Sequence, residues 1–144
     1  MIFLRHNLDF MIFGILGLMS FLMLWFVIER YFYYARVNIE DFQHADGLNI
    51  ALTNRLTIIS TIGANAPYIG LLGTVIGIML TFYDMGQGGK VDVHTIMTGL
   101  SLALKATAAG LVVAIPSIMF YNALLRKVDV INARWREHQD LTSK

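Results

Sequence analysis

The chain has 144 residues, of which 56% are hydrophobic and 15% are charged, and its formal net charge is +1. This composition is too apolar for a soluble domain of this length and indicates a protein that resides in a lipid bilayer. The low net charge argues against nucleic acid as a partner, because binding it requires a clustered basic surface. The absence of cysteine excludes disulfides, thiolate zinc sites and cysteine nucleophiles.

Three apolar runs are each long enough to cross a membrane as a helix, which takes about 20 residues. They cover approximately residues 10–28, 58–83 and 95–125. The first run exceeds the usual length of a signal-peptide core and is not followed by a small-residue cleavage site, so we interpret it as a retained anchor. The predicted fold class is therefore an all-α integral membrane protein, a single domain over residues 1–144 with three transmembrane helices, the second and third of them long.

The distribution of lysine and arginine predicts how these spans are oriented. Eight basic residues lie either between the first two spans, in residues 29–57, or in the tail after the third span, residues 126–144. Arg5 and Lys90 lie on the other side. The N-terminus is therefore expected outside the cytoplasm and the C-terminal tail inside it.

The two predicted cytoplasmic parts differ in pattern. Residues 29–57 are rich in tyrosine close to the membrane, which is typical of an interfacial aromatic belt, and Asp46-Gly47 is expected to break the segment. The third run continues over residues 122–136 as an amphipathic helical pattern. This extension is expected to be either a solvated helix or a surface that docks a partner.

Both later spans carry small residues three or four positions apart, a spacing that places them on one side of a helix. Because lipid is as apolar as leucine, membrane helices associate through close packing and hydrogen bonds, which small residues permit. From the pattern alone, these are either ordinary helix-packing faces or the walls of an oligomer or enclosed pore. The second span has Gly70, Gly73, Thr74 and Gly77, and the third has Gly99, Ala103, Ala106, Thr107, Gly110 and Ala114.

The same two spans each contain a proline, Pro67 in the second and Pro116 in the third. A proline inside a helix removes a backbone hydrogen bond, so both residues predict helix kinks. The kinks are expected either to shape the helices or to bend them around a central cavity.

None of the three spans contains a carboxylate, and Lys105 is the one charged residue of the third span. Ionisable groups inside a membrane are costly and therefore indicate function. Lys105 lies about 200° around the helix from Thr107. It is expected either to reach water by extending its side chain or to form an ion pair with a neighbouring subunit or a partner. If the chain conducts protons, a partner must supply the acid, and Thr74 and Thr107 offer it hydroxyl groups.

No catalytic site, metal site or cofactor is predicted. The four histidines, which are His6, His44, His94 and His138, lie outside the centres of the spans. Neither an HExxH nor a GxSxG pattern occurs. The sequence therefore argues against an enzyme.

Two stretches carry a resemblance to a known family. Residues 66–79, APYIGLLGTVIGIM, and residues 103–122, ALKATAAGLVVAIPSIMFYN, resemble the MotA/TolQ/ExbB proton-channel family. The resemblance implies an inner-membrane stator subunit, five copies of which surround a dimer of an ExbD-like single-span protein that carries an aspartate in its span. It also implies that Thr74 and Thr107 match the family's pore-lining positions.

The resemblance further implies that proton flow drives the partner against the ring, and that a TonB-like protein delivers the work to outer-membrane receptors. A TolQ-like subunit for envelope constriction, a flagellar stator and a non-conducting membrane scaffold are the alternatives. The chain departs from the family pattern twice. It reads Leu102-Ala103-Leu104, followed by Lys105, where the family commonly has Glu-Ala-Leu, and residues 29–57 form a shorter segment than is usual.

Overall fold

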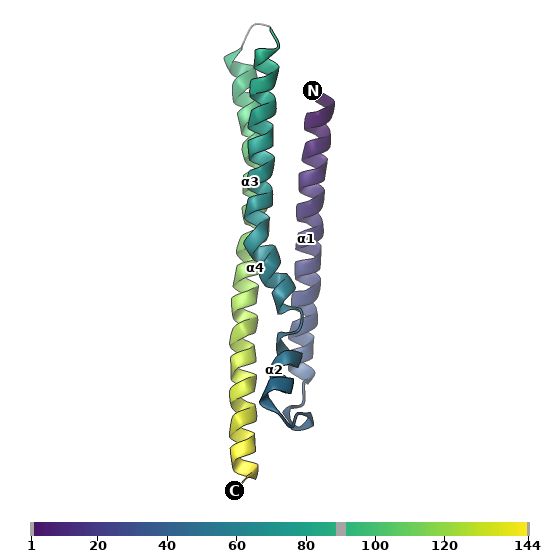
Figure 1. Ribbon diagram of the computed structural model, residues 1–144, viewed down its shortest axis with the longest axis vertical. Coiled ribbons are helices and arrows are strands. Elements are labelled where there is room, and N and C mark those ends of the chain that lie inside the picture. The colour runs from purple at the N-terminus through teal and green to yellow at the C-terminus, as the bar shows by residue number, and fades with distance from the viewer. Residues whose placement is uncertain (1, 89–91, 144) are drawn as a thin grey trace.

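A computed structural model describes residues 2–88 and 92–143, with side chains from residue 6 onward (Figure 1). The elements in these ranges are all helical, and three of them are long and apolar enough to cross a membrane by length and composition. The predicted all-α fold with three long apolar helices is therefore confirmed. In chain order the elements are α1 (Ile2–Arg36), the 3-10 helix η1 (Ile39–Asp41), α2 (Ala45–Thr53), α3 (Leu56–Gly86) and α4 (Val93–Thr142).

The three predicted spans lie within α1, α3 and α4, and each helix is longer than its span. Pro67 and Pro116 lie inside α3 and α4, and both helices continue on either side of the proline. Among the residues counted for the orientation, Lys90 and Lys144 lie outside the described residues.

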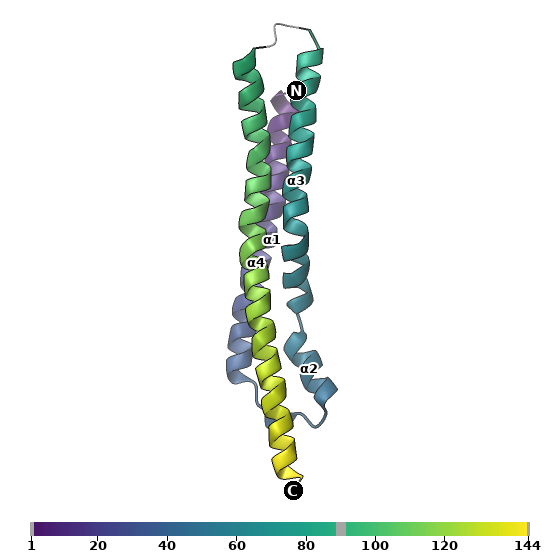
Figure 2. The ribbon, with the colours of Figure 1, turned by 90° about the vertical axis from the view of Figure 1, so that its left-hand side faces the viewer.

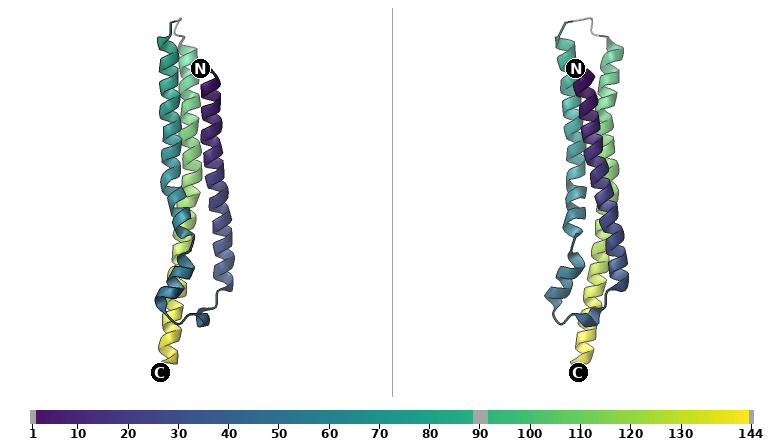
Figure 3. Two further views of the ribbon diagram at one scale, coloured as in Figure 1. Left: turned by 45° about the vertical axis from the view of Figure 1, so that its right-hand side comes forward. Right: turned by 90° about the vertical axis from the view of Figure 1, so that its right-hand side faces the viewer.

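The long helices form a bundle in which α3 and α4 are antiparallel and make the most extensive contact (Figure 1). The third helix, α1, packs against one side of this pair and contacts both of its members. In Figure 2, α1 lies behind the α3–α4 pair, and no helix of the described chain lies in front of the pair. The right-hand view of Figure 3 shows the opposite side, where α1 lies in front of the pair. One side of the α3–α4 pair is therefore covered by α1 and the opposite side is bare.

The sequence of α1 explains why it lies at the margin of the bundle. Its inward face is a row at helical spacing, made of Ile12, Leu16, Met23 and Val27, all of which are buried. Its other faces carry large exposed apolar side chains, such as Phe10, Leu18, Phe21, Leu24 and Trp25. Exposed apolar surface of this extent indicates contact with lipid or with another protein.

A tight connection joins α2 to α3 through Arg55, whose φ angle of 70° is in the left-handed region. This conformation is uncommon for a residue with a side chain. The end of α1 stabilises it, because the Arg55 guanidinium lies 3.6 Å from a carboxylate oxygen of Glu29 and 5.4 Å from the centre of the Phe26 ring.

Large side chains hold together the end of the molecule that contains α2. Buried there are Leu48 and Leu52 of α2 and Leu124, Val128 and Trp135 of α4, which we call the α2 cluster. The extension of α4 beyond residue 122 is thus helical and amphipathic, as predicted. Its apolar side packs against α2 and η1 of the same chain. That side is therefore neither solvated nor free to dock another protein.

Three side chains of the long helices donate hydrogen bonds to main-chain carbonyls of the segment between α1 and α3. Arg30 Nη1 donates a hydrogen bond to the Ala51 carbonyl at 2.9 Å, and Tyr34 Oη donates to the Leu52 carbonyl at 2.5 Å. Trp135 Nε1 donates to the Phe42 carbonyl at 3.0 Å. The interpretation of Tyr34 as part of an aromatic belt is therefore wrong, because its ring is buried inside the chain.

The expected break at Asp46-Gly47 is also wrong. Both residues lie in the first turn of α2, where an acidic side chain is favourable because the helix N-terminus carries a partial positive charge. The packing of Leu48 and Leu52 outweighs the low helix propensity of glycine at this position.

Candidate functional site at the α3–α4 interface

The two helices approach most closely where a glycine of one faces a glycine of the other. A Cβ atom added at Gly70 would lie 2.5 Å from the Ala106 carbonyl oxygen and 3.1 Å from Gly110 Cα. Reciprocally, a Cβ atom added at Gly110 would lie 2.6 Å from the Ala66 carbonyl oxygen. Such distances leave no room for a side chain, so the two backbones pack directly against each other.

Small residues continue this contact along both helices. A Cβ atom at Gly77 would lie 2.9 Å from Ala103 Cβ, and one at Gly73 would lie 2.8 Å from Ala106 Cβ. Gly73 also faces Ile12 of α1, and Ala114 is buried. The structure thus brings most of the small residues that the sequence placed on the two faces against each other, within one chain. We call Gly70, Thr74, Gly77, Ala103, Thr107 and Gly110 the α3–α4 interface.

The two threonines of the α3–α4 interface form a hydrogen bond with each other, from Thr74 Oγ1 to Thr107 Oγ1 or in the reverse direction. The Thr74 hydroxyl is buried and also lies 2.8 Å from the Ala103 carbonyl oxygen and 3.3 Å from the Gly70 carbonyl oxygen. Residues 33 positions apart in the sequence are therefore joined by one hydrogen bond between two hydroxyl groups.

The number of protons limits how this pair can be arranged. Each hydroxyl has one proton to donate and two lone pairs that accept, whereas a carbonyl accepts only. In one arrangement Thr107 donates to Thr74, and Thr74 donates to the Ala103 carbonyl. In the other, Thr74 donates to Thr107, and Thr107 is free to donate elsewhere. The pair thus has two arrangements, and they differ in whether Thr107 presents a lone pair or a proton.

Thr107 is the more accessible member of the pair. It is half-buried, whereas Thr74 is buried. Because successive residues are turned by about 100° on a helix, Thr107 points well away from Ala106, which lies beside the α1-facing Gly73. Around the helix, Ala103 and Gly110, which face α3, lie between Ala106 and Thr107, so Thr107 lies on the flank of the α3 contact that is away from α1.

A third threonine follows the same row but was not singled out from the sequence. Thr81 lies seven positions after Thr74, is buried, and donates to the Gly77 carbonyl at 3.0 Å. A Cβ atom added at Gly99 would lie 2.7 Å from Thr81 Oγ1, so Gly99 makes room for it. The spacing of two helical turns from Thr74 is the sequence signal that could have identified this residue.

Lys105 does not join the threonines. Its side chain is exposed on α4, on a different face from Thr107, and within the described residues no carboxylate lies within 4.0 Å of its amine. The same ranges contain no group of three or more histidine or carboxylate side chains that could hold a metal ion.

Comparison with known proteins gives long matches to one group. Residues 39–137 match the MotA/TolQ/ExbB proton channel family. The biopolymer transport protein ExbB of Helicobacter pylori is 55% identical over 94% of this chain and 94% of its own length. The ExbB of Aquifex aeolicus is 52% identical over 87% of this chain and 84% of its own length. Because the match covers most of the length of both relatives, the short segment between α1 and α3 does not set this chain apart from them.

A TolQ protein also matches, but over a shorter region. The TolQ of the Tol-Pal system in Haemophilus influenzae is 41% identical over 56% of this chain and 36% of its own length. The nearly complete coverage by ExbB proteins, together with three helices suited to a membrane, identifies a multi-pass protein of the inner membrane with ExbB-like function. The chain belongs to the MotA/TolQ/ExbB proton channel family.

Proposed function

We propose that this chain is the stator subunit of a proton channel that couples the proton motive force to TonB-dependent import across the outer membrane. The pore is shared with an ExbD-like single-span partner whose aspartate carries the proton. One observation supports this proposal above others: Thr74 is hydrogen-bonded to Thr107, which is only half-buried and lies on the flank away from α1, in spans that contain no carboxylate of their own.

The two arrangements of the threonine pair suit the two protonation states of a carboxyl group. When Thr107 donates to Thr74, its free lone pair accepts a hydrogen bond from a protonated acid. When Thr74 donates to Thr107, the Thr107 proton is available to a carboxylate, a charge-assisted bond that is roughly twice as strong as a neutral one. The pair thereby offers a hydrogen bond to the acid both before and after it releases its proton.

The arrangement of the helices supports a ring with the α3–α4 pairs inside. The bare side of each pair would face the central partner, and the apolar outer surface of α1 would face lipid. We propose five copies in the ring, a dimer of the partner in its centre, and the α2 end in the cytoplasm, as the excess of basic residues there predicts.

Replacing the hydroxyls by methyl groups tests the proposal. Valine has nearly the shape of threonine, so Thr74→Val and Thr107→Val preserve the packing of the α3–α4 interface. Proton flux into proteoliposomes that contain the co-purified complex is measured with a pH-sensitive dye. Each variant is expected to lower the flux about 10- to 100-fold, because a hydrogen bond to a charged group contributes about 1.5–3 kcal/mol.

Thr61→Val is the matched control. Thr61 lies on α3, is exposed, and donates to the Thr57 carbonyl within its own helix at 2.7 Å. Flux through this variant should equal that of the unaltered complex. If Thr74→Val and Thr107→Val also conduct normally, these hydroxyls are not on the proton path, and the chain is better described as a scaffold for subunits that conduct.

Native mass spectrometry of the complex, purified in mild detergent after co-expression with its neighbouring genes, tests the assembly separately. A ring that retains a single-span protein with an intramembrane aspartate supports the stator. A homo-oligomer that lacks such a subunit, although the subunit is expressed, contradicts it.

A further inference from the structure

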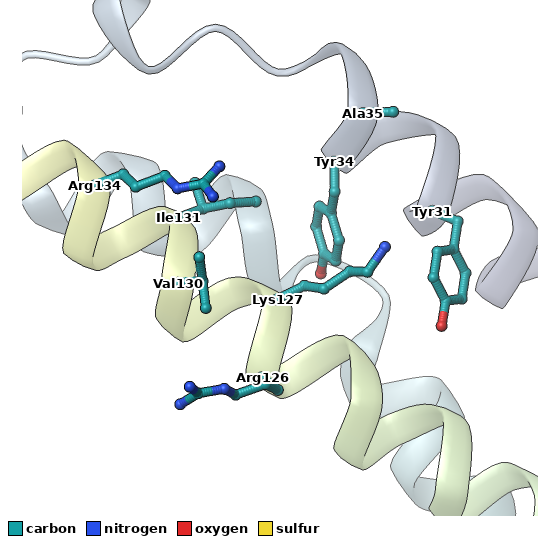
Figure 4. Close-up of a pocket in the computed structure, with 8 residues that line it drawn as sticks. All are labelled: Tyr31, Tyr34, Ala35, Arg126, Lys127, Val130, Ile131 and Arg134. Atoms are coloured by element: carbon teal, nitrogen blue, oxygen red, sulfur yellow. The ribbon is translucent and has the colours of Figure 1, made fainter.

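A cavity of about 290 Å³ lies between the last turns of α1 and the part of α4 that follows its apolar run (Figure 4). Its lining comes from these two helices, with Tyr31 and Tyr34 on one side and Lys127 and Arg134 on the other. It is remote from the threonines of the α3–α4 interface. This volume is near the lower limit of ligand cavities, which suits a small polar group rather than a whole large ligand.

Two cations face α1 across this cavity. Lys127 and Arg134 are seven positions apart, so they lie on the same side of α4. Figure 4 shows the Lys127 amine extending toward Tyr31, and Arg134 on the same side; Arg126 also lines the cavity, but its guanidinium extends toward the other side of α4. Among the described residues, no carboxylate lies within 4.0 Å of Lys127 or Arg134. In contrast, Arg30 and Arg55 share the carboxylate of Glu29. The positive charge in the cavity is therefore not neutralised by an ion pair within the described part of the chain.

The walls of the cavity position Lys127 and supply apolar surface beside both cations. The Lys127 ammonium lies 4.2 Å from the centre of the Tyr31 ring, a cation–π contact. Tyr34 is fixed by its hydrogen bond to the Leu52 carbonyl. Val130 and Ile131, both half-buried, add apolar surface between the two cations. The site combines a positive rim with an apolar and aromatic floor, which suits an anion that carries an apolar body.

The position of the cavity along the helices narrows the nature of that anion. Tyr31 follows the apolar run of α1, which ends at about residue 28, and Lys127 follows that of α4, which ends at about residue 125. The cavity therefore lies at the level where the hydrocarbon region ends and lipid phosphates begin. Basic pockets between helices at this level are suited to anionic headgroups, and a basic residue near an anionic surface contributes roughly a fivefold gain in affinity.

We propose that this cavity binds the phosphate of an anionic phospholipid, with Lys127 and Arg134 as its cationic contacts and Tyr31 positioning the lysine. Phosphatidylglycerol has this chemistry. The lipid would connect α1 to α4 just beside the α2 cluster, and it would thereby link the composition of the membrane to the packing of this end of the chain.

Native mass spectrometry of the delipidated complex tests the site, with the number of lipids retained per chain as the readout. The complex is titrated with phosphatidylglycerol, with phosphatidylcholine and with inorganic phosphate. We expect one phosphatidylglycerol per chain to bind more tightly than phosphatidylcholine. The double variant K127Q/R134Q should weaken this binding roughly 30-fold, and K127R should retain it.

The control is R36Q/R136Q, which removes the same charge from two exposed arginines of α1 and α4 that do not line this cavity. It should leave phosphatidylglycerol binding nearly unchanged. An equal loss in both double variants would show attraction by overall charge and would overturn the proposal. Equal retention of the two lipids, or displacement of phosphatidylglycerol by millimolar phosphate, would also overturn it, the latter by identifying a free anion as the ligand. R134Q alone changes an exposed residue and keeps the test available should the double variant not fold.

Discussion

One helix, α4, builds two contacts of opposite character. In its first half it meets α3 through Ala103 and Gly110, so closely that backbone lies against backbone. In its second half it meets α2 through Leu124, Val128 and Trp135, which are large and buried. The α3–α4 interface contains two hydroxyls bonded to each other, whereas the α2 cluster is bordered by side chains that bond to main-chain carbonyls.

The difference follows from the solvent in which each contact forms. In lipid, burying an apolar side chain provides no gain over leaving it in the bilayer, so helices are held by close approach and hydrogen bonds. In water, each Å² of apolar surface buried contributes about 25 cal/mol, so large side chains are favoured. From the change from small to large residues along α4, we propose that the α3–α4 interface lies within the membrane and the α2 cluster outside it.

The largest loss of stability is expected in the α2 cluster. Trp135 is 8% exposed and its indole donates to the Phe42 carbonyl. Trp135→Ala creates a cavity and leaves that carbonyl without its partner, so the free energy of unfolding should fall by about 3–5 kcal/mol. Thermal unfolding of the purified protein in detergent measures the change.

Trp25→Ala makes the same substitution where the side chain is 59% exposed on α1. Because no buried contact is lost there, the melting temperature should stay close to that of the unaltered chain. Similar destabilisation by both substitutions would mean that the α2 cluster contributes no more than a lipid-facing surface.

A smaller loss is expected at the α3–α4 interface. Gly70→Ala adds one methyl group, 2.5 Å from the Ala106 carbonyl oxygen in the present geometry, so α3 and α4 must separate. Overpacking of this kind costs about 1–3 kcal/mol. The same assay applies, and the proton flux of the complex should fall as well, because the Thr74–Thr107 contact lies one turn away.

Gly14→Ala is the matched substitution, since a Cβ atom at Gly14 would meet no atom within 4 Å. It should be neutral or slightly stabilising, because alanine has the higher helix propensity. If Gly70→Ala is tolerated as well as Gly14→Ala, direct backbone contact is not what holds α3 to α4.

The α3–α4 interface could be predicted from the sequence because its signal is periodic. Gly70, Thr74 and Gly77 recur at helical spacing, and close approach in lipid demands residues of this size. What the pattern could not supply was the partner of each face. The same spacing describes two helices of one chain and two neighbouring subunits, and the structure places these two faces against each other within one chain.

The α2 cluster could not be predicted in the same way because its contacts join residues far apart in the sequence. Trp135 meets a carbonyl 93 positions earlier, and Tyr34 meets one 18 positions later. No local pattern distinguishes a tyrosine in a membrane-interface belt from one that is buried against its own chain. Likewise, Asp46-Gly47 reads as a turn until the packing of Leu48 is known.

The smallest effect on the stability of the chain is expected at Lys105, although it lies in the membrane half of α4. Its side chain is exposed and contacts no carboxylate among the described residues, so Lys105→Met should leave thermal unfolding nearly unchanged.

We propose that the partner of Lys105 is an acid of a neighbouring subunit or of another protein, since an unpaired cation inside a membrane is costly. Lys105→Met should then reduce the fraction of assembled complex in native mass spectrometry, and its proton flux, whereas Lys105→Arg should preserve both. A lysine that merely extends to water predicts that the methionine variant assembles and conducts normally. That outcome would confine the functional polar groups of this half of α4 to the face that carries Thr107.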